Sequence, residues 1–261
     1  MGKLGGLTAF TAEAALWVTG AALIASAAGA HWDFDPSGQI SRIIAGPTAS
    51  PAQSAGPTLA PGASPTISPT VKKFNAFMSS SDGQYKVKLS ITGSATLAGQ
   101  AVSVVESGTS LQSGGNESSS LRTTANGVVT TQDTVSIGGT TYTSDNGRPW
   151  EKGARKPSDN MMDGSTQFVD AGMEIKNGEQ LHRLELADTT AFSNSMMKSM
   201  GASATNAQFT LTAWVHDDGV PALIVAEGWG EMPFNGVTAR LTMKMEMRVI
   251  PMSGVTITAP N

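Results

Sequence analysis

The fold is decided by residues 237–249, which read VTARLTMKMEMRV. Apolar and polar residues alternate along this stretch without a break. Because successive side chains of a strand point to opposite faces of a sheet, the pattern predicts a long strand with one apolar and one solvated face. Solvation of one face is typical of antiparallel sheets. The apolar set is Val237, Ala239, Leu241, Met243, Met245, Met247 and Val249, and the polar set is Thr238, Arg240, Thr242, Lys244, Glu246 and Arg248.

The same alternation recurs upstream, where residues 85–91 (YKVKLSI) place apolar residues at odd positions. Turn signals such as Asn126-Gly127 and Asn177-Gly178 separate further runs of strand-forming residues. Together these runs predict about eleven strands, joined mostly as hairpins in a mainly β (α+β) domain with a large curved sheet or barrel. The further runs are 101–106, 118–124, 128–137, 140–144, 168–175, 180–186, 209–216, 222–229 and 255–258.

One helix interrupts the run of strands. Asp188 is a suitable N-cap for a helix over residues 189–200, and Gly201 is a suitable stop. Phe192, Met196 and Met200 recur every four residues and form one apolar stripe. A weaker helical pattern covers residues 158–168.

Composition excludes several classes of protein. The chain has 261 residues, no cysteine, three histidines and a formal net charge of −4. Without cysteine there is no disulfide scaffold, thiolate metal site or cysteine nucleophile, and few histidines remain for a metal centre. A mildly acidic balance argues against nucleic-acid binding. Few charges with abundant Ser, Thr and Gly indicate an exported β-rich protein, with Ser and Thr on the solvated face of its sheet.

The N-terminal region predicts a membrane-associated segment. Residues 14–30 carry no charge over seventeen positions, and a helix of that length spans roughly 25 Å. Small residues near Ala30 also fit a signal-peptide cleavage site, so residues 1–30 are a signal peptide or a transmembrane anchor. Residues 31–71 form a Pro/Ser/Thr/Ala-rich linker. Such a spacer makes most sense when the N-terminal segment stays in the membrane and holds the folded domain at a distance from it. We therefore favour the anchor, with the folded domain at residues 72–261.

Several short motifs in the folded domain together resemble a known family. In chain order these are residues 140–143 (TTYT) with 149–152 (PWEK), then 178–184 (GEQLHRL), 211–221 (LTAWVHDDGVP) and 255–260 (VTITAP). Their order and spacing resemble the bacterial LolA-like exported proteins, and most of all the LppX/LprG-type actinobacterial cell-wall lipoproteins. The resemblance implies a half-open antiparallel β-barrel of about eleven strands, with helices over a concave face that forms an apolar cavity for acyl chains.

The chain departs from those lipoproteins because it has no lipobox cysteine. Lipid anchoring is therefore excluded, and the helix at residues 14–30 would replace it.

The methionines fit a cavity independently, since Met is flexible and polarisable and adapts to chains of varied shape. The alternative is that these residues fill an ordinary core between helix and sheet. The residues that we expect to line the cavity are Val87, Leu89, Phe168, Leu181, Leu184, Phe192, Met196, Met200, Leu223, Val225, Leu241, Met243, Met245 and Met247.

Candidate catalytic sets are weak. His216-Asp217-Asp218 fits a solvated hairpin tip, and His182 has no evident partner in the sequence. No G-x-S-x-G elbow or phosphate-binding loop is present. We therefore expect no enzymatic activity, no metal site and no cofactor.

Two functions from different classes remain open. The first is a lipid-binding or lipid-carrying protein of the cell envelope. It would be tethered by its N-terminal helix to the outer face of the cytoplasmic membrane, or secreted if cleaved near Ala30, and its partner would be a lipid or acylated ligand. The second is an envelope sensor or regulatory domain of the same fold that binds a membrane protein.

Overall fold

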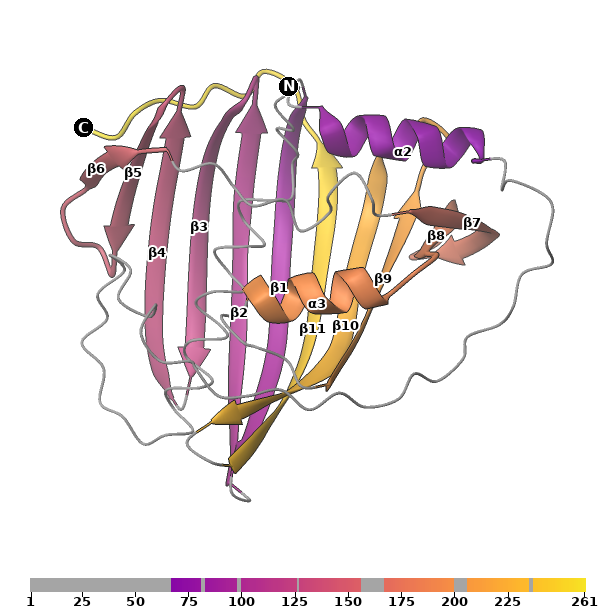
Figure 1. Cartoon of the computed structure of the whole chain (residues 1–261). Helices are drawn as coiled ribbons and strands as arrows, with labels where there is room; N and C mark the ends of the chain where they lie inside the picture. Colours follow the sequence, from indigo (N-terminus) through magenta and orange to yellow (C-terminus); the bar gives the residue numbers. More distant parts are fainter. Residues whose placement is uncertain are drawn as a thin grey trace.

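In a computed structural model, the described residues are 67–80, 83–97, 100–125, 127–155, 167–199, 206–234 and 237–261. Eleven antiparallel strands form one sheet, which confirms the predicted class (Figure 1). The strands are β1 (Gln84–Leu97), β2 (Gln100–Ser113), β3 (Asn116–Ala125), β4 (Val128–Ile137), β5 (Thr140–Asp145), β6 (Glu151–Ala154), β7 (Phe168–Lys176), β8 (Glu179–Leu186), β9 (Asn206–Val215), β10 (Pro221–Phe234) and β11 (Val237–Pro251).

Ten of the expected strands are confirmed, and one expectation is wrong. Residues 255–258 form no strand, because Val255 bonds through its backbone to the side chains of Gln84 and Ser113 and not to a neighbouring strand. The eleventh strand is instead β6, a four-residue edge strand whose sequence EKGA shows no alternation of apolar and polar residues.

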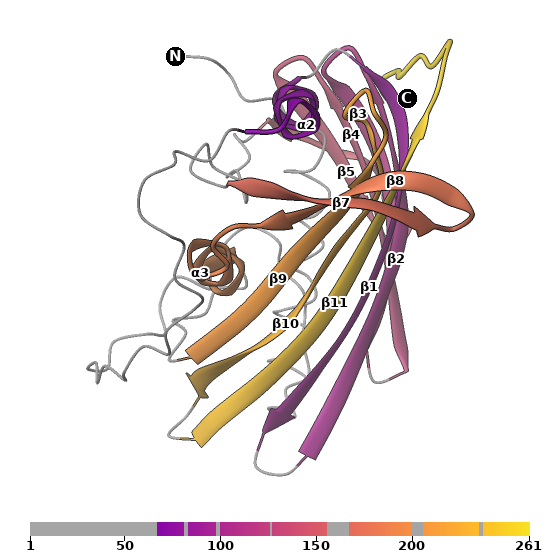
Figure 2. The same cartoon turned by 90° about the vertical axis from the view of Figure 1, so that its right-hand side faces the viewer.

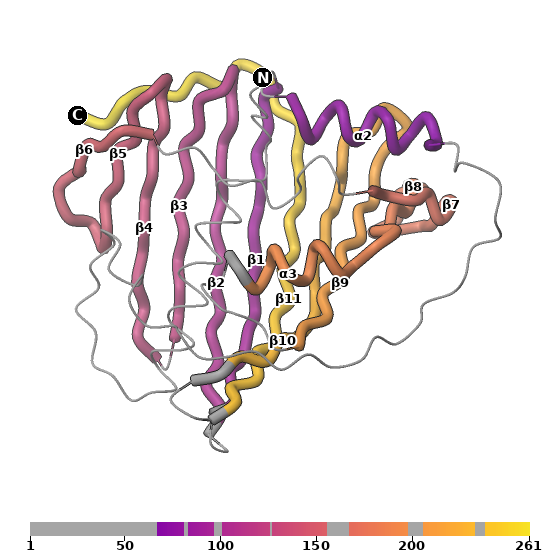
Figure 3. Tube along the Cα trace, in the orientation of Figure 1, coloured from indigo at the N-terminus to yellow at the C-terminus, as the bar shows by residue number. Residues whose placement is uncertain are grey.

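The strand order is β6-β5-β4-β3-β2-β1-β11-β10-β9-β8-β7. The chain enters at the centre, steps outward to β6, crosses to β7 at the opposite edge and steps back to the centre (Figure 3). The first and last strands therefore lie side by side, with Leu89 opposite Met247 and Ile91 opposite Met245. The ends β6 and β7 do not pair with each other, so the sheet is an open half-barrel, as predicted.

Two helices lie on one side of the curved sheet, which we call the inner face (Figure 2). Helix α3 (Thr190–Ser199) is the predicted lid helix, and Asp188 accepts a hydrogen bond from the backbone of Thr190 at its start. The predicted end at Met200 and Gly201 lies outside the described residues, as does nearly all of the weaker helical pattern at 158–168.

Helix α2 (Pro69–Ser79) was not predicted, and its first residues fall in the expected linker. Ser68 is its N-cap, accepting a hydrogen bond from the backbone of Val71 at 3.2 Å, and Pro69 occupies the first turn. Proline is tolerated there because its missing N–H would have had no partner in the helix. The proline that suggested a linker therefore begins a helix.

A single apolar cluster lies between the two helices and the inner face. It extends from Leu121 of β3 through β2, β1, β11, β10 and β9 to β8 and β7. Met245 and Ile224 are fully buried at its centre. Because strands alternate, the outward-facing residues of β11, such as Lys244 and Arg248, are exposed. The predicted alternation is therefore confirmed from Thr238 to Val249.

The inner face becomes polar across β2, β3 and β4. Glu106 alternates with the core residue Val104, and Ser110 lies opposite the core residue Val87, so both share the inner face. The expectation that Ser and Thr cover the solvated face is wrong here, because several Ser and Thr side chains of β2, β3 and β4 are buried on the inner face. The buried polar residues of this region are Glu106, Ser110, Glu117, Ser119, Thr123, Thr134 and Ser136.

The expected anchor and most of the linker, residues 1–66, lie outside the described residues. No helix among the residues that the structure describes is long and apolar enough to cross a membrane.

Candidate functional site

Most of the residues predicted to line a cavity lie together on the inner face. They belong to the single apolar cluster, and none is more than 7% exposed. The periodicity of β1 and β11 places their apolar residues in adjacent rows, while α3 contributes Phe192 and Met196 from above. The predicted residues brought together are Val87, Leu89, Phe168, Leu184, Phe192, Met196, Leu241, Met243, Met245 and Met247.

Three predicted lining residues do not join them. Leu181 and Leu223 belong to a separate cluster with Trp214, and Val225 packs against that cluster. Leu181 is three positions from the core residue Leu184 on the same strand, and an odd separation places side chains on opposite faces. The predicted common wall is therefore wrong for these three, which lie on the outer face. Met200 lies outside the described residues.

Sequence reasoning missed several members of the inner face. Phe209, Ile224 and Met197 are each at most 1% exposed within the main cluster. The signal for Phe209 and Ile224 was present, since each belongs to a run already assigned as a strand. A strand has two alternating sets of side chains, and the neighbouring strands decide which set faces inward. The local pattern of β10 therefore could not show that Ile224, and not Leu223 or Val225, lies on the inner face.

Helix α3 covers the inner face through flexible side chains. Phe192, Met196 and Met197 are buried beneath it. Ser193 ties the helix to β9, because its hydroxyl accepts a hydrogen bond from the backbone N–H of Phe209 at 2.8 Å and donates to the carbonyl of Thr189 at 2.7 Å. A Cβ added at Gly230 would lie 2.3 Å from the sulfur of Met197, so β10 approaches the helix closely.

Helix α2 closes the neighbouring end of the same cluster. Phe74 is fully buried and meets the ring of Phe168 edge to face, with ring centroids 5.1 Å apart. Phe77 meets Tyr85 in the same way at 5.0 Å, and burial together with the charge of Asp218 raises the pKa of Tyr85. Gly219 in the β9–β10 turn also touches the helix, since a Cβ there would lie 2.5 Å from backbone carbon of Lys73.

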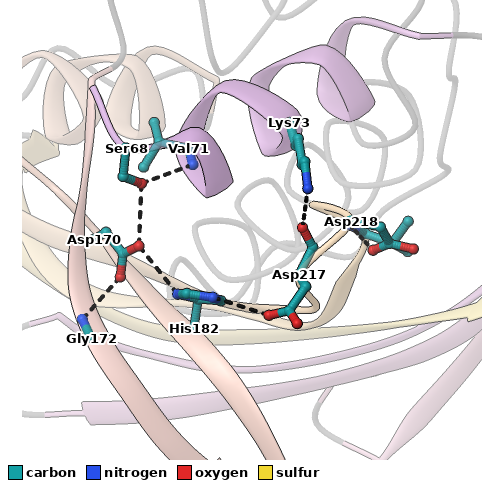
Figure 4. Close-up of polar contacts among 9 residues, drawn as sticks. Ser68, Val71, Lys73, Asp170, Gly172, His182, Asp217 and Asp218 are labelled. Atoms are coloured by element: carbon teal, nitrogen blue, oxygen red, sulfur yellow. Dashed lines mark hydrogen bonds and ion pairs between the residues drawn. The ribbon is translucent and has the colours of Figure 1, made fainter. Parts of the chain in front are cut away.

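A polar cluster joins α2 to the sheet, and we call it the rim cluster: Ser68, Lys73, Asp170, His182 and Asp217 (Figure 4). The two ring nitrogens of His182 lie 3.2 Å from carboxylate oxygens of Asp170 and Asp217. Ser68 donates a hydrogen bond to Asp170 at 3.2 Å, and Lys73 donates to the backbone carbonyl of Asp217 at 2.7 Å. The expectation that His182 lacks a partner is therefore wrong.

The stretch from His216 to Asp218 is a hairpin turn, as predicted. The N–H of Gly219 bonds to the carbonyl of His216, and the Asp218 carboxylate accepts from the N–H of Val220. The Asp217 side chain is 88% exposed. A groove of about 600 Å³ lies beside this turn, lined by Met173, Gln180, His216, Asp217, Asp218 and Pro251. Among the described residues, no group of three or more His, Asp or Glu side chains is arranged to hold a metal ion.

Trp214 anchors the outer face. Its indole N–H donates to Glu174 at 3.2 Å, and the Lys176 ammonium lies 4.1 Å from its ring centroid. The ring packs with Leu181 and Leu223 and is 8% exposed. This burial makes it a packing residue of the sheet and leaves little of the ring accessible to a stacked ligand.

No protein-family model matches the sequence, and no curated protein matches it either. Several solved structures are similar. LprF from Mycobacterium bovis aligns at 14% identity and a TM-score of 0.37, covering 74% of this chain and 98% of that one. The lipoprotein LppX from Mycobacterium tuberculosis aligns at 9% identity and a TM-score of 0.36, covering 72% and 94%.

An outer membrane lipoprotein-sorting protein domain from Vibrio parahaemolyticus, described as putative, aligns at 12% identity and a TM-score of 0.28, covering 72% of this chain and 92% of that one. At these TM-scores the likenesses are partial and do not say what the chain binds. The solved structures similar to this chain include LppX, a protein of the type that the sequence motifs resemble.

Proposed function

We propose that this chain is an extracytoplasmic lipid-binding or lipid-carrying protein whose inner face receives an acyl chain. The observation that carries the proposal is the cover of that face. An open sheet with a continuous apolar cluster is closed by two short helices and not by a second sheet. Such a cover can move without breaking the strand pairing.

The side chains at this cover suit a variable apolar ligand. Met196 and Met197 of α3 belong to the same cluster as Met243, Met245 and Met247 of β11. Unbranched thioether side chains can change rotamer and make room for an acyl chain at low cost. Each methylene that leaves water contributes about 0.8 kcal/mol, so binding needs little polar chemistry.

The proposed location rests on the sequence of the N-terminal region. The uncharged stretch at residues 14–30 and the proline-rich linker support a protein tethered to the outer face of the cytoplasmic membrane. Cleavage near Ala30 would instead release a secreted form. We propose a carrier and not an enzyme, because the His182 carboxylate contacts join structural elements at the rim.

The test measures lipid on the full chain. The protein purified in mild detergent is extracted with organic solvent for mass spectrometry, and exchange of a fluorescent fatty-acyl probe is followed in parallel. We expect co-purified or exchangeable lipid. The absence of both would contradict the proposal.

A matched pair of glycine variants tests the role of the lid. Gly230→Val should force Met197 and α3 away from β10, accelerating probe release by about fivefold, which corresponds to about 1 kcal/mol. Gly153→Val in β6 is the control, because a Cβ at Gly153 meets no atom within 4 Å. Equal release rates in the two variants would show that α3 is not the cover of the ligand.

A second function, binding of a membrane protein partner, is favoured by one observation. Edge strand β7 exposes Val169 (45%), Met173 (47%) and Ile175 (75%), and exposed apolar residues on a sheet edge commonly mark a protein contact. Pull-down of the anchored chain would then capture one membrane protein in stoichiometric amount. Ile175→Asp should abolish the capture, and Val128→Asp, at another exposed position, should not.

A further inference from the structure

Three cations gather on the outer face where β1 begins and β11 ends. Lys88 lies directly opposite Arg248 in the β1–β11 pair, and Lys86 is two positions before Lys88 on the same face of β1. Directly opposite residues of an antiparallel pair have Cβ atoms about 5 Å apart, and like charges placed in this way destabilise a sheet. The sheet therefore holds a repulsive pair of side chains at one end of its central strands.

No carboxylate of the described residues relieves this repulsion. The three cations form no hydrogen bond or ion pair within the part of the chain that the structure describes. By contrast, Arg240 lies 3.6 Å from Glu231, and Lys244 lies 2.9 Å from Glu246, the acidic residue two positions before Arg248. The chain has 21 acidic and 17 basic residues, so the unpaired cations do not result from an excess of basic residues.

Exposed apolar side chains lie beside these cations. Ile250, directly opposite Lys86 in the same strand pair, is 36% exposed, and Met252 is 41% exposed. The backbone N–H of Met252 donates a hydrogen bond to the carbonyl of Gln84 at 2.8 Å, which holds this residue beside the start of β1. Cations and apolar side chains therefore share one surface, which we call the outer patch: Lys86, Lys88, Arg248, Ile250 and Met252.

We propose that the outer patch docks on the surface of a membrane that contains anionic lipids. Its lysine and arginine side chains would contact lipid phosphates, while Ile250 and Met252 would enter the boundary between head groups and acyl chains. A small soluble anion would pair with the cations but would leave the apolar side chains in water. The combination of unpaired cations with exposed apolar residues therefore favours a lipid surface.

The outer patch lies at the end of the sheet where α2 covers the inner face. Tyr85 at the start of β1 contacts Phe77 of α2, and Figure 1 shows the start of β1, the end of β11 and α2 at the same end of the sheet. Docking there would bring this end of the apolar cluster close to the bilayer. This consequence rests on the lipid-binding function proposed above, whereas the docking itself does not.

The test follows the outer patch on the full chain reconstituted in vesicles. Because the chain has no cysteine, Ser253→Cys carries a single environment-sensitive fluorophore at an exposed position next to Met252. The vesicles consist of phosphatidylcholine alone or with phosphatidylglycerol added as the anionic lipid. We expect the anionic lipid to raise the docked-to-undocked ratio about fivefold or more, and high salt to reverse the rise. The same fluorophore on Thr238→Cys, at the opposite end of β11, should show no rise.

Charge variants identify the side chains responsible. Lys88→Gln and Arg248→Gln should each lower the docked-to-undocked ratio about fivefold. Neither should unfold the chain, because each removes one member of a repulsive pair. Lys152→Gln is the matched control, since it makes the same change of charge at an exposed position of edge strand β6 and should keep the full response.

The outcomes separate docking from the alternatives. An equal signal in neutral and anionic vesicles, or a full response when Lys88→Gln and Arg248→Gln are combined, would overturn the docking surface. Binding of inorganic phosphate to the chain in detergent, with no response to anionic vesicles, would replace it with a small-anion site. A chain that carries lipid but does not dock would lose only the docking surface, and a chain that docks without carrying lipid would lose only the carrier function.

Discussion

Asp188 illustrates how a single carboxylate starts the lid helix. Its side chain accepts a hydrogen bond from the backbone N–H of Thr190 at 2.7 Å, at the end of the helix where donors lack partners. The backbone and side-chain hydrogen bonds from Thr190 lower the pKa of the Asp188 carboxyl below its ordinary value. The ionised form is therefore the one that supports α3.

The effect of pH on this cap has a definite sign. Because the pKa of Asp188 is lower in the folded state than in the unfolded state, its contribution is complete above the unfolded pKa and is lost as the pH falls through the folded value. Asp188→Ala should therefore accelerate amide hydrogen exchange in α3 at neutral pH and have little effect in strong acid. Asn194→Ala, at an exposed position on the same helix, is the control. An equal difference at all pH values would contradict a role for the charge.

At the scale of elements, α2 shows how composition can conceal a helix. Residues 47–69 carry six of the chain's prolines, and this run continues to the first residue of the helix. Only Ser68, followed by Pro69, with Val71 and Phe74 on one face, distinguishes the helix from the linker. Packing against the sheet stabilises this helix, because a helix of eleven residues is only marginally stable in isolation.

The contribution of α2 can be measured at its buried aromatic ring. Phe74→Ala should lower the free energy of unfolding by about 3–5 kcal/mol, since the ring is fully buried and contacts Phe168. Denaturant unfolding of the full chain measures this loss. Asn75→Ala, one position along at an exposed site, should change stability little. A loss below about 1 kcal/mol for Phe74→Ala would mean that α2 is not part of the core.

The close approach of the β9–β10 turn to α2 can be separated from backbone strain. Gly219 and Gly254 both have positive φ, at +85° and +70°. Alanine at either position costs about 1–2 kcal/mol from the left-handed backbone alone. Only at Gly219 would the new Cβ also meet α2, at 2.5 Å from the backbone of Lys73. Gly219→Ala should therefore destabilise the chain more than Gly254→Ala in thermal unfolding, and equal effects would exclude the contact.

At the scale of the whole molecule, the sheet depends on one non-local pairing. Strand β11 lies between β1 and β10 at its centre, so the outward run β1–β6 and the returning run β7–β11 are joined there. Loss of β11 would leave two smaller sheets with new edges, each exposing apolar surface.

Two truncations test this arrangement. A chain that ends at residue 236 should fail to fold and should give no soluble β-rich protein by circular dichroism. A chain that ends at Val255 keeps β11 and the backbone hydrogen bonds of Val255 to Gln84 and Ser113, and it should fold. Soluble, folded protein from the shorter truncation would show that the two runs are independent.

Much of the fold follows from local features. Alternation in residues 237–249, glycine-containing turns and the Asp188 cap predict ten of the strands and the lid helix, because hairpins and helix ends depend on neighbours in sequence. The position of most apolar candidates on the inner face was predictable for the same reason.

The remaining features were decided by the tertiary structure. Alternation defines two faces of a strand but does not say which is buried, so Leu181, Leu223 and Val225 were assigned to the wrong face. Three further features depend on residues that are not neighbours in sequence. These are the pairing of β1 with β11, the burial of Glu106 and the approach of two carboxylates to His182. By itself the sequence determined ten of the eleven strands and, where the alternation is unbroken as in β11, that one face is apolar. Sheet curvature and non-local pairing decided which face is covered, and by which helices, because these depend on contacts that no local pattern records.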